Sequence, residues 1–170
     1  MRKTCCAAVA GIVLAITIGV IIMNTPASAS KGSAFDFELT HHHVGLSVPD
    51  AEASAAWYRD MLGFEEVFRM KEKAENEMFI IHIRRGNIYI ELFQVKGAEP
   101  MPAYRRDPNA DLRVHGLKHM ALQVSDAQAA VRELTAKGVE IARPLVDTPT
   151  IAFVFLRDNS GIPFELIQYK

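Results

Sequence analysis

Two histidines and two glutamates stand at matching places in a duplicated segment. His43 opens the stretch HVGLSVPD and His119 opens HMALQVSD, and both fit H-x-x-L-x-V-x-D. Each copy ends on an acidic residue inside an apolar stretch, Glu91 in IYIELF and Glu165 in PFELI. A carboxylate among bulky apolar neighbours is costly to desolvate unless a cation or hydrogen-bond donors compensate it. We therefore interpret these four residues as ligands of one metal ion.

The ligand types restrict the ion. Imidazole and carboxylate donors suit zinc, nickel, manganese, cobalt or iron, and the lack of thiolate ligands disfavours a closed structural zinc site. The chain has two cysteines, Cys5 and Cys6, and both lie in the N-terminal apolar run. Four protein ligands leave positions on a five- or six-coordinate ion for water or substrate oxygens. We expect one divalent ion at a site that is open to substrate.

Each copy of the repeat predicts one strand, one helix and three more strands. Apolar periodicity and turn residues place these elements, in chain order, at 41–48, 51–62, 64–70, 77–84 and 87–95, and at 118–124, 126–137, 139–142, 151–156 and 163–169. Because side chains alternate along a strand, His43 lies on the face opposite Val44 and Leu46. The apolar face can lie under the helix, which leaves the histidine face for a cleft.

The N-terminus is typical of an export signal. Arg2 and Lys3 precede an uncharged apolar run over 5–23, and Ala27-Ser28-Ala29 matches a cleavage site. We assign 1–29 to a signal peptide; the run is also long enough to span a bilayer, so a signal anchor is the alternative. Both place the following domain outside the cytoplasm, periplasmic or secreted, or else anchored to the membrane with the domain outside.

The rest of the chain is expected to form one domain. We assign 30–40 to a leader and 41–170 to the domain, with module one at 41–95, a linker at 96–116 and module two at 117–170. The formal net charge is −1 and no basic run alternates with aromatic residues, so nucleic acid is not an expected partner. The expected partner is a small-molecule substrate; a homodimer is compatible, and membrane contact is expected only through an uncleaved N-terminal segment.

The chain resembles the vicinal oxygen chelate superfamily, which includes glyoxalase I, methylmalonyl-CoA epimerase, extradiol dioxygenases and the bleomycin resistance proteins. HVGLSVPD, HMALQVSD, the two Glu-Leu strand ends and the stretch FLRDNSG over 155–161 carry this resemblance, which covers 41–169. It implies an α+β fold of two tandem βαβββ modules whose curved mixed sheets enclose a metal-binding cleft. The ligand order His, Glu, His, Glu is closest to that of glyoxalase I.

The resemblance also implies a reaction. A metal-dependent isomerase or lyase would act on a small substrate that chelates the ion through neighbouring oxygens, with Glu165 as the base and Glu91 as its alternative or partner. Glyoxalase I has an arginine, and its bacterial forms an asparagine, where this chain has Ser47 and Val95. Neither residue can pair with a glutathione carboxylate, so we expect a reaction that does not depend on glutathione.

Two alternatives and three further histidines remain. An iron(II) extradiol-type dioxygenase would use His43, His119 and Glu165 as its ligands, and a drug- or metabolite-binding resistance protein would catalyse no reaction.

His42 shares a face with Val44, which predicts that the helix covers it. His41 shares the face of His43, and His82 is expected to be a core or sheet-surface histidine.

Overall fold

The computed structural model describes residues 37, 39–71 and 77–170. Residues His41–Lys170 form one compact unit. The predicted export segment over 1–29 and most of the leader lie outside the described residues. Within the described part of the chain, no helix is long and apolar enough to cross a membrane.

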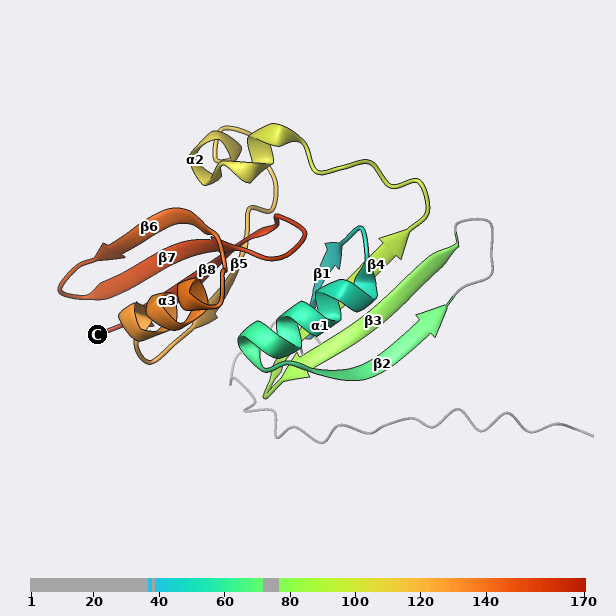
Figure 1. Ribbon diagram of the computed structural model, residues 1–170, viewed down its shortest axis with the longest axis horizontal. Coiled ribbons are helices and arrows are strands. Elements are labelled where there is room, and N and C mark those ends of the chain that lie inside the picture. Colours follow the sequence, from blue (N-terminus) through green and yellow to red (C-terminus); the bar gives the residue numbers. More distant parts are fainter. Residues whose placement is uncertain (1–36, 38, 72–76) are drawn as a thin grey trace, which may run out of the picture. The chain divides into compact units, whose positions relative to one another are not determined.

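Module one is a four-stranded mixed sheet with one helix (Figure 1). Its elements are β1 (Val44–Ser47), α1 (Ala51–Leu62), β2 (Glu65–Lys71), β3 (Met78–Arg85) and β4 (Ile88–Val95). The strand order is β1-β4-β3-β2, in which β1 runs parallel to β4 and the other neighbours are antiparallel. The first strand therefore pairs with the last strand of its own module.

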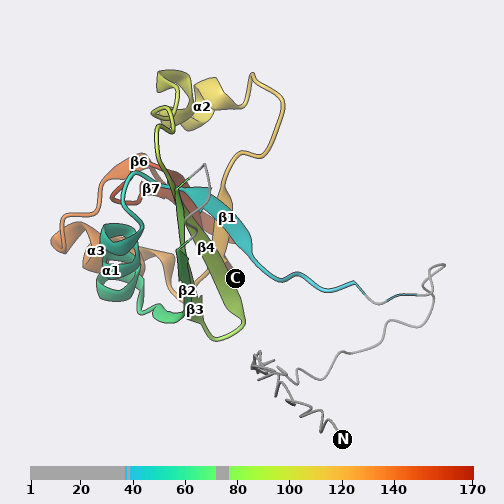
Figure 2. The same ribbon diagram turned by 90° about the vertical axis from the view of Figure 1, so that its right-hand side faces the viewer.

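Module two repeats this arrangement. Its elements are β5 (Met120–Gln123), α3 (Ala127–Ala136), β6 (Ile141–Asp147), β7 (Ile151–Arg157) and β8 (Pro163–Tyr169), in the strand order β5-β8-β7-β6. The connection between the modules carries a 3-10 helix, Ala103–Arg106, and α2 (Pro108–Asp111), which Figure 2 shows away from the strands. The predicted α+β fold of two tandem βαβββ modules is confirmed.

The two long helices begin in the same way. Asp50 accepts a hydrogen bond from the backbone N–H of Ala53 at 2.9 Å, and Asp126 accepts one from Ala129 at 2.8 Å. Each helix also has its first N–H bound by a glutamine from the last strand of the module. Gln94 Oε1 and Gln168 Oε1 accept from the first residues of α1 and α3, both at 3.0 Å. These bonds satisfy N–H groups that a helix start leaves without partners.

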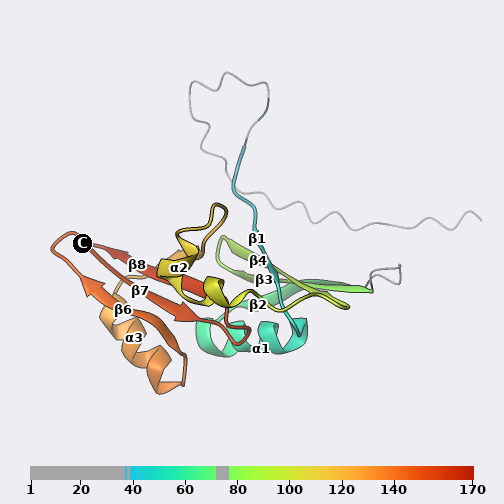
Figure 3. The same ribbon diagram turned by 90° about the horizontal axis from the view of Figure 1, so that it is seen from above.

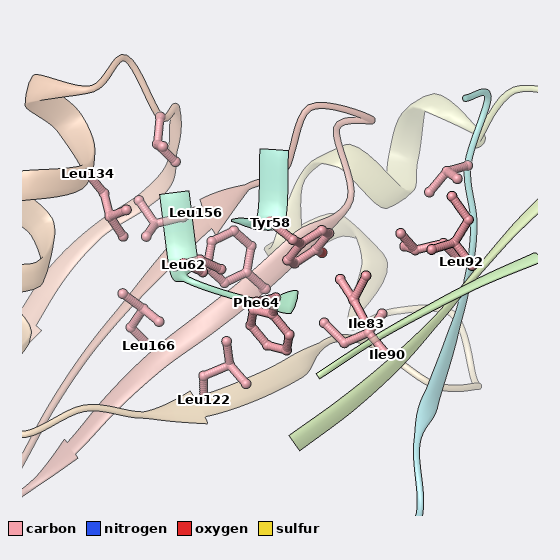
Figure 4. Close-up of a cluster of buried hydrophobic side chains, with 14 of the residues drawn as sticks. Tyr58, Leu62, Phe64, Ile83, Ile90, Leu92, Leu122, Leu134, Leu156 and Leu166 are labelled. Atoms are coloured by element: carbon pink, nitrogen blue, oxygen red, sulfur yellow. The ribbon is translucent and has the colours of Figure 1, made fainter. Parts of the chain in front are cut away.

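One hydrophobic core joins the two modules (Figure 4). Figure 3 shows α1 and α3 on the same side of the sheets, where they cover the apolar strand faces. Fully buried side chains come from both modules and include Tyr58, Phe64, Ile90, Leu92, Val154, Leu156 and Phe164. The Trp57 ring of α1 meets Phe164 of β8 edge to face, with ring centroids 6.0 Å apart. The apolar alternation of the strands thus determines which sheet faces stay open.

Polar contacts also tie module one to module two. The Tyr58 hydroxyl donates to Asp158 Oδ2 at 3.1 Å, and both side chains are buried. The other oxygen of Asp158 accepts from the backbone N–H groups of Ser160 and Ile162, at 2.8 and 2.9 Å. Ser54 of α1 and Ser160 form a second bond at 3.2 Å. This network fixes α1 against the β7–β8 turn.

One strand differs clearly from its prediction. The strand expected at 139–142 is found at Ile141–Asp147 and contains Pro144. Proline lacks a backbone N–H and is tolerated at sheet edges and bulges. β6 is an edge strand, and its pairing with β7 shifts register on either side of Arg143. The proline therefore lies within the strand, and β6 extends beyond the predicted range.

Candidate metal centre

The strand registers place the predicted ligands on one face of each sheet. Parallel pairing sets Gly45 beside Glu91 and Ala121 beside Glu165, and the histidine just before each first strand contacts the glutamate of its own module. We call this face of each sheet the histidine face. Gly45 has a packing role there, because a Cβ atom at this position would lie 2.8 Å from the Phe93 ring. Only glycine lets that ring cross β1 without shifting.

In module one the histidine and the glutamate are in direct contact. His43 Nε2 lies 3.0 Å from Glu91 Oε2, and the side chains are 34% and 15% exposed. The other ring nitrogen of His43, Nδ1, lies 2.7 Å from His42 Nδ1. His42 is exposed and stacks on the Tyr89 ring, with centroids 5.5 Å apart. The prediction that the helix covers His42 is therefore wrong, because the chain before β1 does not keep the strand alternation.

His82 is a member of this cluster that sequence reasoning missed. Antiparallel pairing sets it directly opposite Glu91, and its Nε2 lies 2.9 Å from Glu91 Oε1. The tight turn at Arg85-Gly86-Asn87 was the available signal. Pairing Arg85 with Ile88 across that turn brings His82 opposite Glu91 by counting. His41, which was expected on the same face as His43, is exposed.

Module two contains the equivalent pair with a different neighbour. His119 Nε2 lies 3.2 Å from Glu165 Oε2, with side chains 29% and 14% exposed. The residue opposite Glu165 on the adjacent strand is Phe155, where module one has His82. The Phe155 ring meets His119 edge to face, with centroids 4.8 Å apart. This carboxylate therefore has an aromatic neighbour in place of a second imidazole.

Each pair has donor atoms that fit a shared ion. Two atoms bound to one ion at about 2.0–2.2 Å lie about 2.8–3.6 Å apart when their bonds meet at 90–109°, and the observed separations are 3.0 and 3.2 Å. Among the described residues, however, no group of three or more His, Cys, Asp and Glu side chains is arranged to hold a metal ion. The four predicted ligands thus occur as two pairs, and their joint role stays a prediction.

One pocket includes a predicted ligand, and a second lies at the C-terminal ends of β1 and β4. A pocket of about 550 Å³ is lined by β1, by His119 and by the connection between the modules, including Arg105 and Lys118. Both cations face the buried carboxylate of Asp111, at 3.5 and 3.4 Å. A second pocket of about 950 Å³ is lined by Ser47, Val95 and Arg106, among other residues. The connection therefore contributes walls to both pockets.

Comparison with known proteins identifies the family. Residues 40–166 match the model of the Glyoxalase/Bleomycin resistance protein/Dioxygenase superfamily. The chain belongs to this superfamily. An Escherichia coli protein described as uncharacterized, YaeR, is 33% identical over 133 residues, which cover 75% of this chain and 94% of YaeR. Mitochondrial methylmalonyl-CoA epimerase from Mus musculus is 28% identical over 154 residues, covering 85% of this chain and 82% of the epimerase.

Solved structures of the superfamily share the fold. A glyoxalase family protein from Enterococcus faecalis aligns with a TM-score of 0.63 at 25% identity, over 75% of this chain and 96% of that protein. Trypanothione-dependent glyoxalase I from Leishmania major aligns with a TM-score of 0.60 at 19% identity, over 77% of this chain and 87% of the enzyme. The latter likeness bears on the fold alone. The superfamily assignment that the sequence motifs suggested is confirmed.

Proposed function

We propose that this superfamily member is a metal-dependent isomerase or lyase that removes a proton from a carbon next to a metal-chelating oxygen of a small substrate. The repeated His–Glu pair, with donor atoms 3.0 and 3.2 Å apart on the histidine face of each sheet, carries the proposal. His43, Glu91, His119 and Glu165 would hold one divalent ion. When bound, that ion would stabilise the negative charge that develops on the substrate oxygen.

The two carboxylates suit different parts in this chemistry. Both oxygens of Glu91 lie within 3.0 Å of an imidazole nitrogen. Glu165 has one oxygen near His119 and lies beside the Phe155 ring. A general base needs an oxygen free to approach the substrate proton. We therefore assign proton transfer to Glu165, with Glu91 as its partner.

The proposed substrate carries no glutathione. Ser47 and Val95 hold the positions at which a glyoxalase-like enzyme is expected to bind the glutathione carboxylate, and neither is charged. Arg106 lines the same pocket and is the counter-argument, because a guanidinium can bind a carboxylate in its place. Measuring turnover of the methylglyoxal–glutathione hemithioacetal decides whether Arg106 replaces the missing carboxylate partner. The epimerase relatives make an acyl thioester with an acidic α-carbon the first alternative to test.

We also propose that two copies complete the site as a homodimer. Neither His–Glu pair has further ligands arranged around it in the described part of one chain. Large apolar side chains lie exposed on both histidine faces, with Phe68 at 50%, Met70 at 38% and Tyr169 at 65% exposure. A second copy would cover these side chains and bring module one of each chain against module two of the other.

We also propose, from the N-terminal sequence, that the protein is exported. A cleaved chain recovered outside the cytoplasm should begin at Ser30, whereas a membrane-retained chain should keep Arg2. N-terminal sequencing of both fractions distinguishes these outcomes. A full-length chain found soluble in the cytoplasm would contradict both.

Metal analysis and proton exchange test the proposed reaction together. Protein purified without chelators should contain one zinc, nickel, manganese or cobalt ion per His/Glu/His/Glu set. It should exchange the acidic α-proton of its substrate for deuterium in D2O, and methylmalonyl-CoA is the first probe. The methylglyoxal–glutathione hemithioacetal should react well below the ordinary enzymatic range, which begins at a kcat/KM of about 10⁴ M⁻¹s⁻¹. Oxygen-sensitive iron with ring cleavage would favour the dioxygenase, and metal-free protein would favour the binding protein.

A further inference from the structure

The carboxylate of Glu91 is held from two sides. His43 Nε2 lies 3.0 Å from one oxygen, and His82 Nε2 lies 2.9 Å from the other. The histidine rings come from β3 and from the residue before β1, with centroids 5.7 Å apart. Strand pairing fixes His82, since this residue lies directly opposite Glu91 on the adjacent strand. The position of His82 is thus a property of the register and not of a mobile loop.

The chemistry of the contact identifies the donor. An ionised carboxylate only accepts hydrogen bonds, so a neutral His82 must carry its proton on Nε2 to bind Glu91 Oε1. His43 has the opposite requirement if its Nε2 binds a cation, because that nitrogen then supplies its lone pair. Its proton then lies on Nδ1, which can donate to His42 Nδ1 at 2.7 Å. His42 and His82 therefore offer an outer partner to each ligand of module one.

Module two has no such partners in the part of the chain that the structure describes. Phe155 takes the place of His82 opposite Glu165, and it cannot bond to a carboxylate. The residue before His119 is Lys118, whose ammonium binds the backbone oxygen of Asp111 at 2.6 Å. The module-two pair is consequently held by fewer bonds than the module-one pair.

We infer that His82 is a positioning residue for Glu91, and that it makes module one the pre-organised half of the metal site. This inference rests on the proposed metal site. A hydrogen bond to Glu91 Oε1 fixes the carboxylate so that Oε2 stays beside His43 Nε2, ready for a cation. Partners of this kind orient the ligand and raise its affinity, and their loss typically weakens metal binding by about 10- to 100-fold. His82 itself binds no metal in this arrangement.

The test compares cobalt(II) affinity across variants of the full-length chain. His82→Phe installs the residue that module two uses and should weaken binding by about 10- to 100-fold. His82→Gln retains an N–H donor and should recover most of the affinity. Glu133→Gln is the control, because this α3 side chain is 68% exposed and belongs neither to the histidine face nor to the surface proposed to meet a second copy. It should bind like the unaltered chain.

Two further readouts separate positioning from damage to the fold. Visible absorption of the bound cobalt should change in His82→Phe and return in His82→Gln, while thermal unfolding of the metal-free proteins stays within the range of the Glu133→Gln control. Equal affinity and an equal spectrum in His82→Phe would overturn the inference and leave the proposed metal site intact. If the unaltered chain binds no cobalt, the proposed metal site and this inference both fail.

Discussion

Module one and module two share a topology but surround their glutamates differently. Across module one, one row of paired residues is Phe68, His82, Glu91 and Gly45; the same row of module two is Arg143, Phe155, Glu165 and Ala121. Both modules have a glutamate with a small residue beside it on the first strand. The residues on the other two strands differ, because Phe68 and His82 of module one correspond to Arg143 and Phe155 of module two. A duplicated scaffold can therefore keep its ligand geometry and still change how firmly each carboxylate is held.

The core offers the largest test of whether the modules are separate units. Phe164 is buried in module two and contacts Trp57 of module one, so Phe164→Ala should lower the free energy of unfolding by about 3–5 kcal/mol. Trp57 fluorescence and circular dichroism should report one coincident urea transition. Leu112→Ala, at a residue 64% exposed, should change stability by no more than about 0.5 kcal/mol. Separate transitions by the two probes would show that the modules unfold independently.

A mixing experiment tests whether the halves of the site come from different chains. His43→Ala and His119→Ala should each lose metal by more than the about 10- to 100-fold expected for an outer partner. If a site joins module one of one chain to module two of another, unfolding and refolding the two variants together restores intact sites. Random pairing would recover about one quarter of the unaltered number. Titration with cobalt measures this, and no recovery would place each site within one chain.

The buried contact between the modules predicts a smaller loss. Tyr58→Phe removes the hydroxyl that donates to Asp158 and leaves a buried carboxylate oxygen without that partner, at a cost of about 1–3 kcal/mol. Urea unfolding at neutral pH measures the change. An unchanged stability would mean that this contact contributes nothing to joining the modules.

The pH dependence of stability in an Asp158→Asn variant tests the same contact from the carboxylate side. Burial raises the pKa of the Asp158 carboxyl above its usual value of 3.8. The folded state then binds the proton more tightly than the unfolded state, so this group lowers stability as pH rises from the ordinary aspartate range through the raised pKa. An asparagine does not titrate. The stability of the variant relative to the unaltered chain should therefore increase over that window.

The smallest expected losses of stability concern the equivalent glutamines at the starts of α1 and α3. Gln94→Ala and Gln168→Ala each remove one acceptor at a helix start, and each should cost about 0.5–1.5 kcal/mol. The two losses should agree within about 0.5 kcal/mol and add in the double variant, because the sites lie in different modules. Thermal unfolding of the three variants is sufficient. A large difference would show that the repeat is less symmetrical in energy than in geometry.

Sequence reasoning recovered the elements whose local signals agreed with their place in the fold. Both long helices begin at an aspartate, and α1 ends at Gly63, which has a positive φ of 66°. It did not locate elements whose position depends on the surrounding fold more than on local sequence. Pro144 lies inside β6 because an edge strand tolerates it, and the Asp107-Pro108 start of α2 precedes too short a helix to show an apolar period.

The candidate site was predictable in its pairs but not in its surroundings. The repeated motifs bring His43 to Glu91 and His119 to Glu165, because histidine and glutamate lie on neighbouring strands in each copy. Strand periodicity alone does not place His82, because its contact with Glu91 follows from the exact pairing of Arg85 with Ile88 across the β3–β4 turn. Gln94 and Gln168 were missed although each follows its glutamate by three residues in Glu-Leu-x-Gln. Whether the two pairs share one ion depends on packing that strand patterns do not encode.

The parallel pairing of β1 with β4 has a consequence for the order of folding. The β3–β4 hairpin closes across a tight turn, and hairpins of this kind form within about 1–10 μs. β1 pairs with β4 across the whole of α1, β2 and β3, and closing that longer loop costs more entropy. Glu91 and His82 can thus meet early, whereas His43 arrives with the last strand. Contact between His43 and Glu91 would mark the moment at which module one is complete.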